Sequence, residues 1–381
     1  MILTFINGCG RQEISTIKKP LPPPESQQIE KTPDPVTIEI TAVGDFLMHM
    51  PVVYSSWNPE KKDYNFASQL TDVEKYLSAP DITIANLETR LAGKENGGYS
   101  GYPQFNCPEQ LALGMKEVGI DVVTTANNHS LDRGFDGLLT TLENLESAGL
   151  KPVGNYKTEQ DRRPLVMEVK KVKIGILNYT YSTNGIPIPE GKDYAIDIID
   201  LDSMKKDINY LQNQQTDLII AYLHFGTEYQ RQPNQFQKDL VSNLFNMGVD
   251  VIFGDHPHVL QPLDMQQNNF VIYSLGNFIS NQRWQYSDSG VIVNVTIKKD
   301  FTSNTCKITE VDYIPTWVHV YWEEGKKKYR VVPVEKAISD YEDEQDNTIS
   351  KSDYLRLKEV WQETTLLLNN NEDNILPRAV H

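Results

Sequence analysis

Residues 249–258 read VDVIFGDHPH, an apolar run that ends in a Gly-Asp pair and two histidines. The run 249–253 is short, apolar and β-branched, which predicts a buried β-strand. Asp255, His256 and His258 would then follow the carboxyl end of this strand. The same arrangement, a strand-sized run followed by polar residues, recurs at five other places in the chain, and it determines the expected fold.

Short apolar runs alternate with amphipathic helical patterns from residue 36 onward, which is typical of an α/β domain. The predicted strands are residues 37–43, 82–85, 122–125, 173–179, 218–223, 249–253, 270–273 and 291–297. The predicted helices are residues 66–77, 108–118, 134–148, 202–212, 234–247 and 352–368. Because the carboxyl ends of strands in an open α/β sheet point to one edge, we expect the polar residues after the strands to gather there.

The amino-acid composition and the length of the apolar runs argue against two classes of protein, nucleic-acid binders and membrane-spanning proteins. The 381 residues include 36 Lys or Arg and 52 Asp or Glu, so the formal net charge is −16. This acidic balance argues against a nucleic-acid-binding protein, which needs basic patches to meet phosphate. No apolar run approaches the roughly 18 to 20 residues of a membrane-spanning helix. We therefore expect a globular body that does not cross a bilayer.

The first 36 residues differ from the rest. Residues 1–8 are mostly apolar and precede Cys9, which resembles the end of a bacterial lipoprotein signal with Cys9 as the lipidated residue. An incidental cysteine in a disordered terminus is the alternative. Residues 10–36 contain six prolines among polar residues, which predicts a disordered tether. The expected organisation is a remnant lipoprotein-type signal (1–9), this tether (10–36), the α/β domain (37–320) and a C-terminal extension with one helix (321–381).

The residues that follow the predicted strands are of the types that ligate divalent metals in proteins. Five of the seven histidines lie in these segments. Carboxylate, imidazole and amide oxygen suit Mn²⁺, Fe²⁺ or Zn²⁺, and there are enough ligands for two ions, the usual arrangement for attack on phosphorus. The candidate residues are Asp45, His49, Glu88, Asn128, His129, His224, Glu228, Asp255, His256, His258 and Asn277.

Each segment alone has a structural alternative. Gly44-Asp45 is typical of a turn, and Asn128-His129 could cap the next helix. His224 could be a hydrogen-bonded core residue, and Glu88 could pair only with Arg90. The pair His256 and His258 is harder to dismiss, because alternate residues of an extended segment place both rings on one side. The joint occurrence of these segments favours a metal or anion site.

The ordered motifs GDFLMH, ANLE, NNHSLD, HFGTEY, GDHPHVLQ and SLGNFI resemble those of the capsule-synthesis CapA family, the poly-γ-glutamate synthesis accessory proteins of the calcineurin-like metallophosphoesterase superfamily. The resemblance covers residues 36–319. It implies a four-layer α/β/β/α sandwich with a metal site at its rim. It also implies residence on the outer face of a bacterial membrane, within machinery that makes, exports or anchors an anionic polymer.

The resemblance assigns roles to individual residues. Position 47 is a leucine where the superfamily has a histidine, so His49 could substitute for it. His129 matches the acid that protonates a leaving oxygen. Asp255, Glu228 and Asn277 are additional candidates. The residues that match metal ligands are Asp45, Glu88, Asn128, His224, His256 and His258.

Two hypotheses remain. The first is a cell-surface, dinuclear metallophosphoesterase that takes part in capsule or envelope-polymer synthesis. The second is a non-catalytic subunit whose rim binds the anionic polymer or the membrane-bound capsule synthase. Leu47 favours the second hypothesis, whereas His129 and the pair His256 and His258 favour the first. We expect Cys107 to be an inert thiol, and an oxidising exterior would permit a disulfide between Cys107 and Cys306.

Overall fold

The computed structural model describes residues 1–6, 8–10, 33–369 and 375–380. The chain divides into two units, Met1–Pro33 and Asp34–His381, and the second unit contains the folded domain. The described residues of the first unit form no helix or strand. The predicted tether, residues 10–36, lies outside the described residues except for 10 and 33–36.

The first of two large sheets has nine strands, with β1, β4, β5 and β6 parallel at one side. Strand β14 pairs antiparallel with β1 and continues the sheet into the long hairpin β15–β16, while β13 joins β1 and β17 joins β15. The strand bounds are β1 (Val36–Phe46), β4 (Ile82–Asn86), β5 (Val122–Thr124), β6 (Lys151–Val153), β13 (Asn277–Ile279), β14 (Ser289–Asp300), β15 (Thr305–Glu323), β16 (Lys326–Pro333) and β17 (Leu376–Pro377).

The second sheet has six strands in the order β11-β12-β10-β9-β8-β7. Its four inner strands are parallel, and the two edge strands run antiparallel. Every residue of β9 is buried, which explains why its sequence is continuously apolar rather than alternating. The bounds are β7 (Leu165–Val169), β8 (Val172–Thr180), β9 (Leu218–His224), β10 (Val251–Asp255), β11 (Leu260–Gln266) and β12 (Asn269–Leu275). Strands β2 (Trp57–Asn58) and β3 (Asp63–Tyr64) form a separate ribbon.

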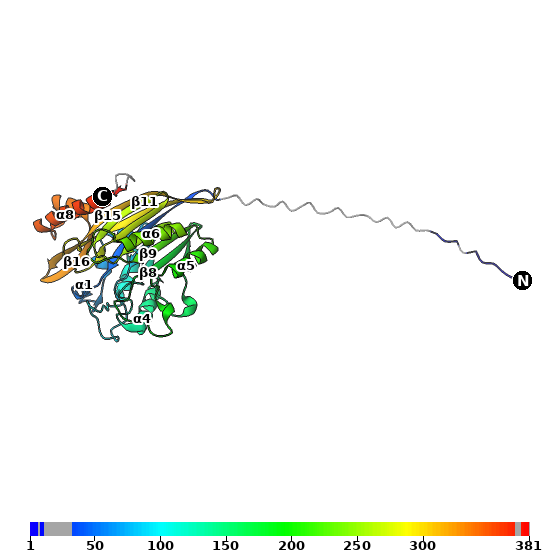
Figure 1. The fold of residues 1–381 in the computed structure, drawn as a ribbon, viewed down its shortest axis with the longest axis horizontal. Helices are drawn as coiled ribbons and strands as arrows, with labels where there is room; N and C mark the ends of the chain where they lie inside the picture. The colour runs from blue at the N-terminus through cyan, green and yellow to red at the C-terminus, as the bar shows by residue number, and fades with distance from the viewer. Residues whose placement is uncertain (7, 11–32, 370–374, 381) are drawn as a thin grey trace. The chain divides into compact units, whose positions relative to one another are not determined.

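The two sheets pack face to face with helices on both outer sides, so the domain has the predicted four layers. The inner core joins Ile40 and Ile84 of one sheet to Ile174 and Ile220 of the other. Helices α1 (Met50–Ser55), α2 (Glu74–Ser78) and α3 (Gln110–Glu117) cover the first sheet. Helices α5 (Leu201–Asn213) and α6 (Gln235–Met247) cover the second, as Figure 1 shows beside β8 and β9. The α/β sandwich expected from the sequence is thus confirmed.

The other helices pack at the margins. Helix α4 (Gly134–Ser147) follows the loop after β5 and packs over Ala126 and Leu131. Helices α7 (Val334–Glu342) and α8 (Lys351–Leu368) pack together against β15 and β16. The described residues also form three 3-10 turns, η1 (Ala67–Gln69), η2 (Glu159–Asp161) and η3 (Asp193–Ala195).

All eight predicted strands are present, and five of the six predicted helices form. The exception is the helix over 66–77, which breaks into η1 and the short α2. Its apolar residues do recur at helical spacing, but the chain leaves the helical region at Leu70. Thr71 follows, and its hydroxyl lies 3.5 Å from the Ala67 carbonyl oxygen, so a side chain competes with the helical backbone there.

The segment after residue 320 has more structure than the single helix expected there. Strand β16 belongs to the first sheet, and α7 precedes α8. Helix α7 buries only Val334 and Ala337, which is too small an apolar face to stand out in a sequence that soon becomes acidic. Cys107 is buried and Cys306 half-buried, and both thiols are free. Burial raises the pKa of the Cys107 thiol well above its ordinary value, which is consistent with an inert residue.

Across the described residues, we find no helix that is both long and apolar enough to traverse a bilayer.

Candidate metal centre

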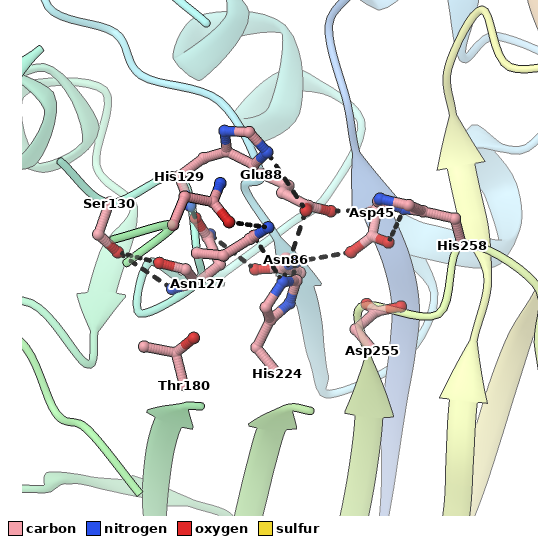
Figure 2. Close-up of polar contacts among 12 residues, drawn as sticks. Asp45, Asn86, Glu88, Asn127, His129, Ser130, Thr180, His224, Asp255 and His258 are labelled. Carbon is pink, nitrogen blue, oxygen red and sulfur yellow. Dashed lines mark hydrogen bonds and ion pairs between the residues drawn. The ribbon is translucent and has the colours of Figure 1, made fainter. Parts of the chain in front are cut away.

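Strands from both sheets converge on one edge of the sandwich. Asp45 is near the end of β1 and Glu88 follows β4 in the first sheet. His224 and Asp255 are the last residues of β9 and β10 in the second sheet. Figure 2 shows the Glu88 side chain between the His224 ring and the pair formed by Asp45 and His258. The polar residues that follow the strands are therefore brought together, from two sheets rather than one.

Two groups of side chains here could each hold a metal ion. One group comprises Glu88, His224 and His256, and the other comprises Asp45, Glu88 and His258. In each group the ligand atoms lie within 4.8 Å of one another, and all five residues are buried. Glu88 belongs to both groups, so its carboxylate stands where it could bridge two ions.

The distances within these groups leave room for an ion. Glu88 Oε1 lies 3.5 Å from His224 Nε2, and Glu88 Oε2 lies 3.7 Å from His258 Nδ1. His258 Nδ1 also lies 3.1 Å from Asp45 Oδ2. Two ligands bound to one metal at about 2.0 to 2.2 Å are themselves roughly 3 to 3.5 Å apart, close to these separations.

Several buried polar atoms around this space have no hydrogen-bond partner among the described residues. They include both carboxylate oxygens of Glu88, Oδ1 of Asp255 and Nδ1 of His256. Burial first, and then the nearby Asp45 carboxylate, raises the pKa of Glu88 and of Asp255 well above the ordinary range. Buried carboxylates that repel one another and lack donors are costly unless a cation compensates them. The residues present therefore fit a divalent metal.

Burial holds His224 and His256 in their neutral, metal-binding form. Burial lowers the pKa of His224 and of His256 well below the ordinary value, and the neighbouring histidines lower it further. The Asn128 side-chain oxygen lies 2.9 Å from His224 Nε2, and the Asn277 oxygen lies 3.2 Å from His258 Nδ1. Both amide oxygens therefore lie at the ring nitrogens that face Glu88, where they could add oxygen ligands to the two groups.

His129 lies beside the two groups. Its Nδ1 lies 2.7 Å from Asp132 Oδ2, and its Nε2 lies 4.0 Å from Glu88 Oε1. Asp132 also accepts a hydrogen bond of 2.7 Å from the Phe105 backbone amide, which fixes the carboxylate. This carboxylate holds a proton at Nδ1 and leaves Nε2 facing the metal-ligand groups, the arrangement of an oriented acid or base.

The loop that carries His256 and His258 is not extended, contrary to expectation. Both residues have positive φ angles, 101° and 57°, and Tyr229 opposite them has φ 61°. Non-glycine residues seldom adopt this conformation, which persists where the surrounding structure imposes it, most often at functional sites. The Tyr229 backbone amide donates a 2.8 Å hydrogen bond to the Pro257 carbonyl. The turn sends the two imidazoles to different ligand groups.

Three residues named from the sequence belong to neither ligand group. His49 Nδ1 lies 3.2 Å from the Leu47 carbonyl, and burial lowers its pKa to about 4. Glu228 is exposed at the mouth of the site. Asp255 is adjacent to Asp45 but is hydrogen-bonded to the Tyr222 hydroxyl at 2.6 Å.

The structural alternatives do not account for these residues. Gly44-Asp45 lies within β1 rather than in a turn. The residue that caps α4 is Arg133, not Asn128 or His129. In the described chain no ion pair joins Glu88 to Arg90, whose guanidinium instead donates to the Leu87 carbonyl at 2.9 Å.

Sequence reasoning missed three residues of the site. Asn86 donates to Asp45 Oδ1 at 2.7 Å and lies 3.4 Å from His224 Nδ1. Tyr222 links the sheets, because its hydroxyl lies 2.9 Å from the Val43 carbonyl as well as beside Asp255. Asp132, three residues after His129, is the third, and this spacing was the available signal.

Two cavities open beside His129. One, of about 430 Å³, is lined mainly by aromatic side chains and by His129 and His258. The other, of about 350 Å³, is lined by polar residues that include Asn128 and Asp132. Tyr102, His129 and Glu228 border both, so a ligand at the metal-ligand groups would have space on either side of His129.

Comparisons with known proteins identify a family, related sequences and a solved structure of similar fold. Residues 39–282 match the family model "Bacterial capsule synthesis protein PGA_cap". The capsule biosynthesis protein CapA of Bacillus anthracis is 26% identical over 275 residues, which cover 70% of this chain and 65% of that protein. The PGA biosynthesis protein CapA of Bacillus subtilis is 26% identical over 301 residues, which cover 76% of this chain and 74% of that protein.

In fold, the chain is similar to a solved structure from Staphylococcus aureus assigned as a 5′-nucleotidase. The TM-score is 0.50 and the identity 15%, and the match covers 86% of this chain and 58% of that one. The chain, which is similar to the CapA proteins of two Bacillus species, thus belongs to the bacterial capsule synthesis protein PGA_cap family.

Proposed function

We propose that this protein takes part in capsule or poly-γ-glutamate synthesis as a metal-dependent phosphoester hydrolase. The family match and the two CapA relatives support the pathway. The single observation that supports the chemistry is the sharing of Glu88 between two buried ligand groups. A shared carboxylate between two sets of nitrogen and oxygen ligands is the arrangement used for two-metal attack on phosphorus.

Different residues of the chain would hold the ions and transfer the proton. Divalent ions, when bound, would generate hydroxide and neutralise the phosphoryl oxygens. Asp45, Glu88, His224, His256 and His258 would hold them. Asn128, whose amide oxygen lies at the metal-facing nitrogen of His224, would add an oxygen ligand. His129, oriented by Asp132 at Nδ1, would in its doubly protonated form give the Nε2 proton to the leaving oxygen or steady the phosphoryl group.

The test is the metal content of the purified protein, by elemental analysis before and after incubation with Mn²⁺. Hydrolysis of a chromogenic phosphodiester and a chromogenic phosphomonoester is measured on the same samples. Near two ions per chain together with turnover would support the dinuclear hydrolase. Absence of bound metal and of turnover would overturn it.

A second function is favoured by one observation. Leu47 stands where the superfamily has a histidine, and it is buried with 2% of its surface exposed. His49 does not join either ligand group. If metal binds without turnover, the same rim would serve to bind an anionic envelope polymer or subunits of the capsule synthase. Binding of polyglutamate to the metal-loaded protein, without turnover of any ester, would support this function.

We also propose that the protein acts at the outer surface of a bacterial membrane, held by a lipid on Cys9. The lipoprotein-like sequence before Cys9 supports this, as does the exposure of that thiol. Metabolic labelling with a clickable fatty acid tests it, with Cys9→Ser as the control. An unlabelled protein would contradict lipidation but would not affect the proposed chemistry.

A further inference from the structure

The larger cavity beside the metal centre has two aromatic walls. Phe105 meets the His129 ring edge to face, with centroids 4.8 Å apart, and Tyr102 extends that wall. Tyr229 lies 6.0 Å from the His258 ring, and Trp284 packs edge to face on Tyr229. Both walls therefore begin at residues of the site described above.

The rings are available to a ligand. Trp284 is 60% exposed, Tyr102 77% and Tyr229 42%, in a cavity of about 430 Å³. Exposed aromatic side chains gathered around one cavity are unusual on a protein surface unless something binds there.

The Tyr229 wall is held in place relative to the metal centre. The Tyr229 hydroxyl accepts a 3.2 Å hydrogen bond from Gln282, whose side-chain oxygen accepts one of 3.0 Å from Asn277. Asn277 in turn contacts His258. The cavity is thus preorganised, which reduces the entropy lost when a ligand binds.

The cavity is lined by an acidic side chain and by no Lys or Arg among the described residues. Glu228 borders this cavity and its polar neighbour, and no Lys or Arg lines either one among the described residues. In the described structure no ion pair involves Glu228, although its charge acts on Tyr181 and Tyr229. His49, with its pKa lowered to about 4, is neutral near pH 7.

We propose that this cavity binds a cationic organic group of the alkylammonium type. Aromatic faces next to a carboxylate are the combination that recognises ammonium ions, through the ring quadrupoles and the negative charge together. A carboxylate-rich polymer would be repelled by Glu228 in this cavity, and no basic side chain lines the described cavity to offset that repulsion. Taken with the proposed hydrolase function, on which this step rests, the cationic group is the substituent of the phosphoester.

Binding is tested first, on the full chain without added metal, by saturation-transfer NMR and calorimetry. Choline is compared with its uncharged isostere 3,3-dimethylbutan-1-ol, and with glutamate as an anionic probe. We expect choline to bind about tenfold more tightly than the isostere. Equal affinity of the two, preference for glutamate, or no binding of choline would each overturn the proposal.

Matched variants locate the binding. Glu228→Gln should remove the preference for choline over the isostere, and Trp284→Leu should weaken both. Glu324→Gln and Trp322→Leu alter an exposed acid and an exposed tryptophan on the β15–β16 hairpin, away from the cavity, and should change neither affinity. Equal effects of the cavity variants and the hairpin variants would overturn the assignment to this cavity.

Turnover separates this proposal from the hydrolase function. With Mn²⁺ present, p-nitrophenyl phosphocholine is compared with p-nitrophenyl 3,3-dimethylbutyl phosphate. Faster hydrolysis of the choline ester, lost in Glu228→Gln, supports both proposals. Selective choline binding without hydrolysis of either ester supports the cavity and contradicts the hydrolase. Hydrolysis of both esters at equal rates supports the hydrolase and contradicts the cavity.

Discussion

At the scale of single residues, Glu88 is the side chain on which both ligand groups depend. It is fully buried, its two oxygens have no hydrogen-bond partner among the described residues, and it faces His224 on one side and His258 on the other. His256 and His258 each belong to one group only. Substitution of Glu88 should therefore affect both ligand groups, whereas substitution of His256 or His258 should affect only one.

We expect Glu88→Ala to abolish binding of both ions, because it removes a ligand from each group. His256→Ala and His258→Ala should each lower metal content by about one ion. Elemental analysis after incubation with Mn²⁺ measures this, with His49→Ala as the control that keeps both ions. Full metal content in Glu88→Ala would refute the shared-ligand arrangement.

Asp132 acts through His129 rather than on a ligand. We expect Asp132→Asn to lower phosphodiester turnover about 10- to 100-fold, since the ring loses its orienting carboxylate. Metal content should stay unchanged, because Asp132 is in neither ligand group. Asp136→Asn, an exposed change on α4, is the matched control. Unchanged turnover in Asp132→Asn would show that His129 needs no partner.

At the scale of elements, the site depends on how closely the backbone of β1 approaches its neighbours. A Cβ atom at Gly44 would lie 1.9 Å from the Gly276 carbonyl oxygen. That contact is backbone, so it cannot be relieved by a change of rotamer. The glycine therefore lets β1 carry Asp45 into contact with the turn after β12.

We expect Gly44→Ala to destabilise the protein by about 1 to 3 kcal/mol, because the strands must separate to admit the methyl group. The same shift would displace Asp45 and weaken metal binding. Urea unfolding with and without Mn²⁺ measures both effects. An unchanged unfolding midpoint would mean that the two backbones can move apart freely.

His319 on β15 provides a prediction for pH. Arg330 on β16 donates to its Nδ1 at 3.1 Å, so the neutral ring carries its proton on Nε2, 3.6 Å from Asp353 of α8. Burial first, and then Arg330, lowers the pKa of His319 from 6.5 to about 4. Between these values the unfolded chain binds a proton that the folded chain does not, so stability falls as the pH is lowered.

By this linkage, His319 should cost about 2 kcal/mol of stability between pH 7 and pH 5. His224 and His256 act in the same direction, so the contribution of His319 must be isolated by substitution. We expect the free energy of unfolding of His319→Gln to fall less than that of the wild type over this range. Parallel losses in the two proteins would show that His319 does not titrate differently on unfolding.

The elements show what sequence could and could not predict. The strands were predictable because parallel strands buried on both faces are continuously apolar, as in 218–223. Helix α1 was missed because six residues are too few for a helical period to be visible. The His256 turn was misjudged because positive φ angles at histidine leave no signal in sequence.

At the scale of the whole molecule, the site residues were predictable but their geometry was not. The positions of Asp45, Glu88, His224 and His258 after strands were visible in the chain. Periodicity alone could not show that these strands belong to two sheets; the layered fold came from the family resemblance. Asn86 and Tyr222 were missed because an amide and a phenol beside strands resemble ordinary core polar residues.

Each ligand group draws on both sheets, so metal should stabilise the whole sandwich. Binding to the folded state alone adds about 2.7 kcal/mol at a free metal concentration of one hundred times Kd. We expect Mn²⁺ to raise the melting temperature of the wild type but not of Glu88→Ala. Differential scanning calorimetry checks this, with Mg²⁺ and Zn²⁺ for comparison. An equal rise in both proteins would place the stabilising ion elsewhere.

The two-sheet origin of the ligands also bears on where the protein acquires its ions. Asp45 and Glu88 come early in the chain, and His224, His256 and His258 come more than a hundred residues later, from the other sheet. A chain that crosses a membrane unfolded would carry no assembled site with it. Its ions would be drawn from the compartment in which the sheets pack, so the metal supply of that compartment, as much as ligand chemistry, would decide which element the protein uses.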